Sequence, residues 1–184
     1  MQCQVYHSRE VQAWEQRWFK QQNSSYGLMQ QAAWAISQKL IPLLHAKNVA
    51  HIAVCCGQGN NAGDGYLLAT YLQAAGFQVH IYRAVLGASS DLKQAHDTAQ
   101  ASDILIYPHF QFQQSYDVYI DALFGIGLNR DLDENWQSII HDINAQHGLK
   151  VSIDLPSGLH ANTGQPLPIC IQADYSYCIL AYKA

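Results

Sequence analysis

Residues 49–76 read VAHIAVCCGQGNNAGDGYLLATYLQAAG, and this segment predicts the type of sheet. Its first part, residues 49–55, is a short apolar run of the kind that forms a buried strand. A glycine-rich turn follows and leads directly into a helical pattern over residues 61–75, which Gly76 ends at a C-terminal cap position. A strand, a glycine-rich turn and a helix in this order indicate the first unit of a parallel sheet.

The rest of the chain continues this alternation. Further strands are predicted over residues 77–84, 103–107, 116–121, 149–154 and 174–180, and further helices over residues 91–100 and 135–146. The first 46 residues predict two more helices, and the pattern of the second is disturbed at Pro42. Strands that alternate with helices favour an α/β fold, in which helices cover both faces of a parallel sheet.

Composition limits the class of protein. The chain has 184 residues, enough for one domain with a full hydrophobic core. Ten Lys and Arg against 14 Asp and Glu give a formal net charge of −4, which argues against a nucleic-acid partner. No apolar run approaches the roughly 20 residues that span a bilayer, and the first residues do not resemble a signal peptide, so no membrane segment is expected. The five cysteines, at irregular positions, predict reduced thiols and a cytoplasmic location.

Unusual residues follow three of the predicted strands. These segments are residues 57–65 (GQGNNAGDG), 121–127 (DALFGIG) and 154–158 (DLPSG). Parallel strands end at the same edge of a sheet, and open α/β sheets bind ligands beyond that edge. We therefore expect the three segments to meet and to form a binding site.

The glycine-rich segment at residues 57–65 suits a phosphate. Its glycines let the backbone approach a ligand, and the first turn of a helix offers N–H groups to an anion. A structural interpretation is also open, in which Asn60 or Asn61 caps the helix and Asp64 complements its dipole. Gly63 and Asp64 also resemble the anion hole of ribokinase-like sugar kinases, although that pair lies late in the chain of those enzymes.

Two carboxylates, Asp121 and Asp154, each end a predicted strand. Such residues commonly cap a helix or bond to a nearby loop. Pro156, however, stiffens the turn beyond Asp154, and a fixed acid or base requires such a turn. The side chains of Asn61, Asp121 and Ser157 all offer oxygen atoms, which suit a hard cation and, with one carboxylate, a monovalent ion.

Four segments in the same order resemble the N-terminal domain of the YjeF family, the NAD(P)H-hydrate epimerases. Residues 59–65 (GNNAGDG) are similar to the family signature GNNGGDG, with Ala62 in place of a glycine. Residues 28–33 resemble the helix motif LMExAG, residues 121–130 resemble DALFGTGLxR, and residues 153–164 resemble IDxPSGLxxxTG. The resemblance covers nearly the whole chain, so a single domain of this family is predicted over residues 1–184.

The resemblance implies a three-layer α/β/α, Rossmann-like sandwich with a mainly parallel sheet and two N-terminal helices. It also implies an isomerase that interconverts the R and S forms of hydrated NADH and NADPH, called NADHX and NADPHX. These damaged cofactors carry a hydroxyl at C6 of the nicotinamide ring. With help from an acid the ring nitrogen can expel that hydroxyl, and water can return to either face with help from a base.

The resemblance assigns roles to the strand-end residues. Asp154 is the expected catalytic residue, a general acid or base. The expected substrate contacts are Asn60, Asn61, Ala62, Gly63, Asp64, Gly125, Ile126, Gly127, Leu128, Asn129, Arg130, Asp131 and Asp154. A potassium ion is expected on Asn61, Asp121 and Ser157, where it would hold the three segments in register near the phosphates.

A binding module is the main alternative to an enzyme, because the same domain occurs in non-catalytic scaffolds. The presence of Asp121, Asp154 and the paired asparagines favours an enzyme. The resemblance further implies a homodimer. It also implies a dehydratase that repairs one epimer, either as a second domain of a longer chain or as a separate partner enzyme.

Overall fold

The computed structural model describes residues 5–21, 24–179 and 182–183. The main sheet has six strands in the order β4-β3-β2-β5-β6-β7, and every neighbouring pair is parallel. These strands are β2 (His51–Cys56), β3 (Gln78–Arg83), β4 (Leu105–Tyr107), β5 (Val118–Ala122), β6 (Leu149–Ile153) and β7 (Tyr175–Tyr177). A small second sheet pairs β1 (Val5–Tyr6) with β8 (Tyr182–Lys183) in parallel.

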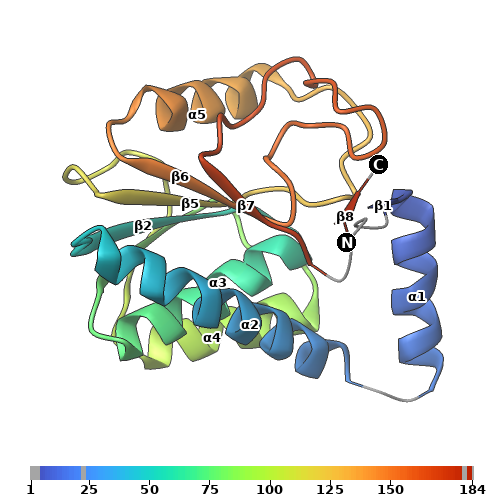
Figure 1. Ribbon diagram of the computed structural model, residues 1–184, viewed down its shortest axis with the longest axis horizontal. Coiled ribbons are helices and arrows are strands. Elements are labelled where there is room, and N and C mark those ends of the chain that lie inside the picture. The colour runs from blue at the N-terminus through green and yellow to red at the C-terminus, as the bar shows by residue number, and fades with distance from the viewer. Residues whose placement is uncertain (1–4, 22–23, 180–181, 184) are drawn as a thin grey trace.

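Helices cover both faces of the main sheet, which confirms the predicted three-layer α/β/α architecture (Figure 1). They are α1 (Ser8–Lys20), α2 (Ser25–Ala46), α3 (Asn60–Ala74), α4 (Ser90–Ala101) and α5 (Glu134–Ala145). In Figure 1, α2, α3 and α4 lie below the sheet, α5 lies above it, and α1 stands beside the small sheet. One buried hydrophobic cluster includes Leu40 and Leu68, and a second includes Tyr119 and Ile140, so each helical layer has its own core.

The strand order places a switch point in the middle of the sheet. The chain runs outward from β2 to β3 and β4, returns to β5 on the other side of β2, and continues to β6 and β7. The adjacent strands β2 and β5 are therefore followed by connections that leave in opposite directions. Ligands of open α/β sheets bind in the crevice at such a point.

Most predicted elements lie within one or two residues of their expected bounds. α2 is longer than expected, because it passes through Pro42 and ends at Ala46. Pro42 is exposed, whereas Leu40 and Leu44 are buried, so packing against the core offsets the loss of one backbone hydrogen bond. β7 ends at Tyr177, and residue 180, the expected end of the last strand, lies outside the described residues.

α1 is attached to the rest of the molecule through its first turn. The Asn162 side chain accepts a hydrogen bond from the backbone N–H of Ser8 at 2.9 Å and donates one to the Ser8 hydroxyl at 3.0 Å. Val11 is 1% exposed, whereas Trp14 and Trp18 are 36% and 42% exposed. α1 therefore packs through one narrow side and leaves most of its surface uncovered.

The paired thiols of Cys55 and Cys56 are buried, as their place in an apolar run suggests. Burial raises the pKa of both thiols, so neither is a nucleophile at neutral pH. Cys170 and Cys178 are also free thiols, while Cys3 lies outside the described residues. The reduced state of the thiols stays a prediction of the sequence.

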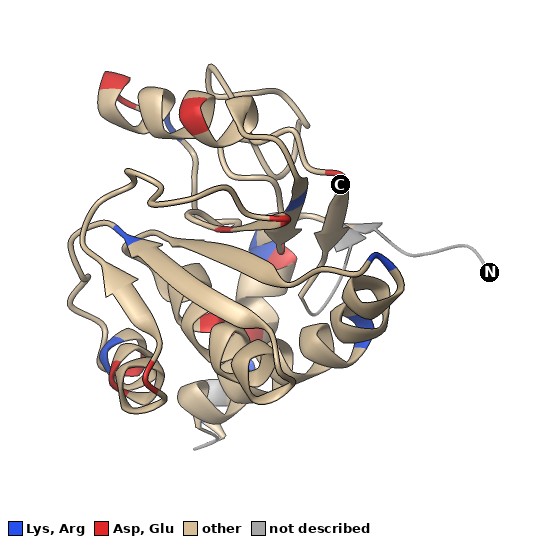
Figure 2. Cartoon of the chain, turned by 90° about the vertical axis from the view of Figure 1, so that its left-hand side faces the viewer, with Lys and Arg blue, Asp and Glu red and all other residues tan. Residues whose placement is uncertain are grey.

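Charged side chains are sparse. Figure 2 shows the strands of the main sheet largely without charge. Within the described segments, no helix combines the length and the apolar character that crossing a membrane requires.

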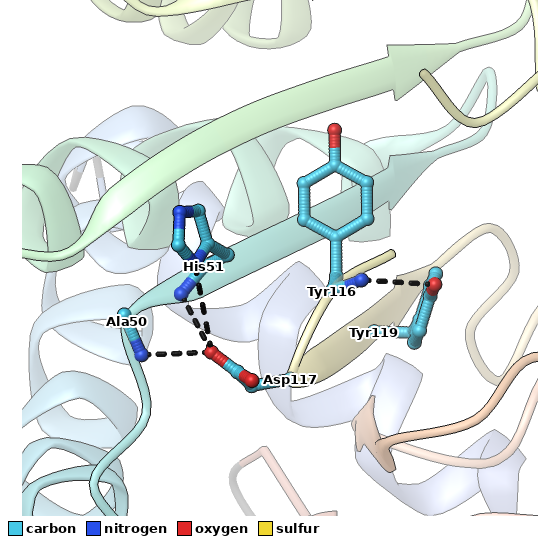
Figure 3. A network of polar contacts seen from close by, with 5 residues as sticks. All are labelled: Ala50, His51, Tyr116, Asp117 and Tyr119. Carbon is cyan, nitrogen blue, oxygen red and sulfur yellow. Dashed lines mark hydrogen bonds and ion pairs between the residues drawn. The ribbon is translucent and has the colours of Figure 1, made fainter. Parts of the chain in front are cut away.

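Asp117 joins the beginnings of β2 and β5 (Figure 3). Its carboxylate accepts hydrogen bonds from the backbone N–H groups of His51 and Ala50, at 2.9 and 2.8 Å. These two bonds lower the pKa of Asp117 below its ordinary value. Beside it, the backbone N–H of Tyr116 donates to the Tyr119 hydroxyl at 3.2 Å, which fixes the chain as it enters β5.

Gly63 is a packing position between α3 and α2. A Cβ at this position would lie 2.5 Å from Sδ of Met29 and 2.6 Å from its Cε. Since Met29 is buried, we expect Gly63→Val to lower the free energy of unfolding by about 1–3 kcal/mol. Chemical denaturation measures this change, and adding Met29→Ala should restore part of the stability. A Gly63→Val protein as stable as the parent would contradict this packing.

Asp117 should contribute to stability in a pH-dependent way. We expect Asp117→Ala to lower the free energy of unfolding by about 1 kcal/mol at neutral pH, because two hydrogen bonds are lost at a half-exposed site. The folded-state pKa is lowered, so the contribution is fully present above the ordinary value of 3.8 and is lost as the pH falls through the folded value. Denaturation of parent and variant should therefore differ at pH 7 and converge in acid; a constant difference would argue against this role.

Candidate active site

A cavity of about 470 Å³ lies at the C-terminal ends of β2 and β5, where the strand order places the switch point. Its walls come from α1, the start of α3, the loop after β5, and the segments after β6 and β7. The lining residues are Val11, Gln12, Glu15, Gln58, Gly59, Asn60, Asn61, Asp64, Leu123, Phe124, Gly125, Ile126, Gly127, Leu128, Asn129, Arg130, Asp154 and Ile179.

Close backbone contact joins the segments that follow β2 and β5. The N–H of Gly57 donates to the Ala122 carbonyl at 3.0 Å, and a Cβ on Gly57 would lie 1.9 Å from the Leu123 carbonyl oxygen. Only a glycine permits this approach. α3 then begins after its N-cap residue Gly59, without a side-chain hydrogen bond to its first turn. The positive end of α3 therefore faces the cavity, an arrangement that favours an anion.

Most of the predicted substrate contacts line this cavity. They are Asn60, Asn61, Asp64, Gly125, Ile126, Gly127, Leu128, Asn129, Arg130 and Asp154. Ala62 and Gly63 do not line it, because Ala62 is fully buried in the core and Gly63 packs on Met29. Asp131 lies in a smaller neighbouring cleft of about 280 Å³, together with Trp136. The three strand-end segments thus meet as expected, but α3 turns the middle of the glycine-rich motif toward α2.

Asp121 is a buried carboxylate, 1% exposed, at the end of β5. It accepts hydrogen bonds from the hydroxyl and the backbone N–H of Ser157 at 2.5 and 2.8 Å. The Ser152 hydroxyl and the Leu123 N–H donate at 2.8 and 3.2 Å. Burial raises the pKa of Asp121, and these four hydrogen bonds oppose the increase. They also tie the end of β5 to β6 and to the turn beyond it.

Asn61 and Ser157 meet at Phe124, in the loop after β5. The Asn61 amide donates to the Phe124 carbonyl at 3.0 Å, so this side chain does not cap the helix. The Ser157 hydroxyl oxygen accepts from the Phe124 N–H at 2.8 Å and lies 3.2 Å from the same carbonyl. Asn61, Asp121 and Ser157 therefore belong to one hydrogen-bonded group, in which Phe124 supplies a further oxygen. One carboxylate with neutral oxygens fits a hard cation of low charge.

Asp154 follows β6 in a backbone conformation that is uncommon for residues other than glycine. Its φ is 68°, and the backbone N–H of Leu155 donates a hydrogen bond to the Ile153 carbonyl at 3.0 Å. A positive φ between two residues bonded in this way is typical of a strained γ-turn. The Asp154 N–H donates to the Tyr177 carbonyl at 2.9 Å, and its Oδ1 accepts from the Ile179 N–H at 3.2 Å. Strain that neighbouring groups hold in place is common at functional sites.

Asp64, in the second turn of α3, is a further buried carboxyl group of the cavity, 9% exposed. Burial raises the pKa of Asp64 well above its ordinary value, and the charges of Asp154 and Glu15 add to the increase. Two carboxyl groups in different surroundings, Asp64 and Asp154, thus face one cavity, as acid–base chemistry requires.

α1 contributes three cavity residues that sequence reasoning did not identify, Val11, Gln12 and Glu15. Their position depends on the contact between Ser8 and Asn162, which are 154 residues apart, so no local pattern could reveal it. The other unpredicted lining residues are Gln58, Gly59, Leu123, Phe124 and Ile179. All of these except Ile179 lie within the strand-end segments. Their positions next to the motif residues could therefore have predicted that they line the cavity.

The chain is similar to known proteins over most of its length. Residues 25–184 match the family described as YjeF-related protein N-terminus. The bifunctional NAD(P)H-hydrate repair enzyme Nnr of Synechocystis sp. is 34% identical over 176 residues, which cover 95% of this chain and 33% of that protein. The NAD(P)H-hydrate epimerase of Limosilactobacillus fermentum is 34% identical over 151 residues, which cover 80% of this chain and 71% of that protein. The chain thus spans about one third of the bifunctional relative.

The fold has a counterpart among solved structures. The crystal structure of yeast ynu0 matches with a TM-score of 0.87 at 18% identity, over 98% of this chain and 82% of that one. This likeness concerns the fold, while the matching residues 25–184 and the identity to the two relatives establish the family. They confirm the resemblance of the four motifs: the chain belongs to the family of YjeF-related protein N-terminal domains.

Proposed function

We propose that the protein is an NAD(P)H-hydrate epimerase, which interconverts the R and S forms of NADHX and NADPHX in the repair of nicotinamide cofactors. The cavity at the switch point carries the proposal, because it combines carboxyl groups with a helix end that favours an anion. Relatives named as NAD(P)H-hydrate epimerases and as a repair enzyme support it. The reaction needs acid–base groups and no hydride carrier, which suits these residues.

In this proposal the substrate phosphates bind at the first turn of α3. Asn60 and Asn61 lie there, and Arg130 offers a guanidinium from the loop after β5. The same loop contributes Gly125, Ile126, Gly127, Leu128 and Asn129 to the wall of the cavity. The nicotinamide ring would then extend toward Asp154.

Asp154 is the proposed acid–base residue. When the C6–O bond breaks, the electron pair stays on oxygen, which takes a proton and leaves as water, while the nitrogen lone pair forms a double bond to C6. Water then attacks C6 from the other face, and the double-bond pair returns to nitrogen. A carboxylate at the position of Asp154 can take the proton that this water loses.

We further propose that Asn61, Asp121 and Ser157 hold a potassium ion, with the Phe124 carbonyl as an additional oxygen. No Lys, Arg or His of the described residues forms an ion pair with Asp121, and hydrogen bonds are the contacts that satisfy this buried carboxyl group. A bound cation would supply positive charge to this carboxylate and to the nearby phosphates.

The remaining parts of the proposal concern partners. A dehydratase, fused or separate, would consume one epimer, in line with the bifunctional relatives. A homodimer and a cytoplasmic location remain predictions of the resemblance and of the composition. Trp14, Trp18 and Trp34, which are 36%, 42% and 55% exposed on α1 and α2, are candidates for a dimer contact.

An assay with separated R and S epimers of NADHX tests the proposed function. The protein should convert either epimer into a mixture without ATP, and chromatography follows the change. Asp154→Asn should slow this conversion by about 10²–10⁴-fold, because the amide cannot exchange a proton. Asn tolerates a positive φ, so the turn should survive the substitution.

Asp142→Asn, an exposed change on α5, is the matched control and should leave the rate unchanged. A parent protein that converts neither epimer faster than buffer would support a non-catalytic binding domain instead. If Asp154→Asn kept the parent rate, another group would have to be the acid–base residue.

Potassium dependence can be tested separately, at constant ionic strength maintained with choline chloride. Removing KCl should lower the epimerisation rate, and Ser157→Ala should raise the half-activating KCl concentration about tenfold, since one ligand oxygen is lost. Ser152→Ala is the matched control, because it removes a hydrogen bond to Asp121 but no proposed ligand. A parent rate that does not respond to KCl would exclude the ion.

A further inference from the structure

The cavity holds more acid–base groups than the mechanism above assigns. Its charged residues are Glu15 from α1, Asp64 from α3, Arg130 after β5 and Asp154 after β6. Three of these four groups are carboxyl groups, and the mechanism above uses only Asp154.

Asp64 differs from the other two buried carboxyl groups of the site. Asp121 has four hydrogen-bond donors, and Asp154 accepts the N–H of Ile179. The Asp64 carboxyl makes no hydrogen bond to any described residue, although the residue is only 9% exposed. A carboxyl group that is buried without a donor is more stable neutral than ionised. Asp64 lines the cavity, where it can meet a ligand.

The charges around Asp64 act in the same direction as its burial. Burial is the largest cause that raises the pKa of Asp64 well above its ordinary value, and the negative charges of Asp154 and Glu15 add to the increase. Arg130 is the cationic side chain of the cavity lining, and it is exposed, so solvent screens its effect. α2, on the other side of α3, contributes the uncharged Met29 at this level. Burial and both charges thus favour the protonated form of Asp64, which is the form that can donate a proton.

We propose that Asp64 is a second catalytic residue, the acid that protonates the departing C6 hydroxyl, while Asp154 takes the proton of the incoming water. The inference rests on the proposed epimerase function. As the C6–O bond breaks, its electron pair stays on oxygen, which takes the Asp64 proton and leaves as water; the nitrogen lone pair forms the double bond to C6. Water then attacks C6, the double-bond pair returns to nitrogen, and the Asp154 carboxylate takes the released proton.

Two carboxyl groups account for catalysis in both directions. One turnover leaves Asp64 ionised and Asp154 protonated, and this form converts the opposite epimer back with the roles exchanged. The two carboxyl groups have then exchanged one proton through the substrate and water, so one acid and one base remain available. They come from different elements, α3 and the end of β6, and both line the cavity.

The test compares the epimerisation rates of the parent, Asp64→Asn and Asp142→Asn at saturating KCl from about pH 5.5 to 9, each corrected for the rate in buffer. The parent rate should fall as the pH rises through the Asp64 pKa, because the acid form disappears. Asp64→Asn should lose about 10²–10⁴-fold at neutral pH and should also lose this alkaline fall. Asp142→Asn should follow the parent at every pH. Asn has the shape of a neutral Asp, so the variant should unfold at the parent temperature, which is measured alongside.

Each other outcome overturns the proposal in a distinguishable way. An Asp64→Asn protein with the parent rate shows that Asp64 donates no proton. A slowed variant that keeps the alkaline fall shows that Asp64 only positions the substrate. A parent that is inactive at all pH values removes the epimerase function itself, and the role of Asp64 with it.

Discussion

The buried carboxylate of Asp121 is the contact on which the arrangement of the site depends. A carboxylate that is 1% exposed is tolerated only with several donors, and it finds them on β6, on the turn after β6 and on the residue after its own strand. Satisfying Asp121 therefore fixes how the ends of β5 and β6 lie against each other. The same bonds place the Ser157 hydroxyl at Phe124, where the Asn61 amide arrives from α3. One desolvated charge thus aligns all three strand-end segments.

Three aspartates of the site show how surroundings, rather than residue type, set chemical roles. Asp121 has four donors and no opening to the cavity, which suits a fixed charge. Asp154 is held by a strained turn and by the Ile179 N–H, so its position is fixed while its side chain still lines the cavity. Asp64 has no donor among the described residues, and burial favours its neutral form. Three residues of the same type thus differ in their hydrogen-bond donors and in their access to the cavity.

Hydrophobic periodicity was enough to predict the layered sheet, and the rule that parallel strands end at one edge was enough to predict that residues 57–65, 121–127 and 154–158 meet. Both depend on local patterns. The sequence did not predict that Gly63 faces α2 and not the cavity, because this depends on which side of α3 packs against Met29. The turn at Asp154 is a similar case. The sequence suggests that Pro156 makes this turn rigid, but in the structure hydrogen bonds to the backbone of Tyr177 and Ile179 also hold it. Long-range contacts of this kind have no signature near the residue that they fix.

Helix packing explains why glycines occur at positions 63 and 65 of the motif, whereas phosphate binding does not. Gly63 leaves room for Met29 of α2, and a Cβ at Gly65 would lie 2.5 Å from the Cβ of Ala122, so α3 lies close to α2 on one side and close to the sheet on the other. Asp64 lies between these two glycines, on the remaining side, toward the cavity. Larger residues at 63 and 65 would push α3 outward, and the carboxyl group would become hydrated and ordinary in its pKa. The glycines therefore act on the chemistry indirectly, because close packing of the helix is what keeps an acid buried at the end of the sheet.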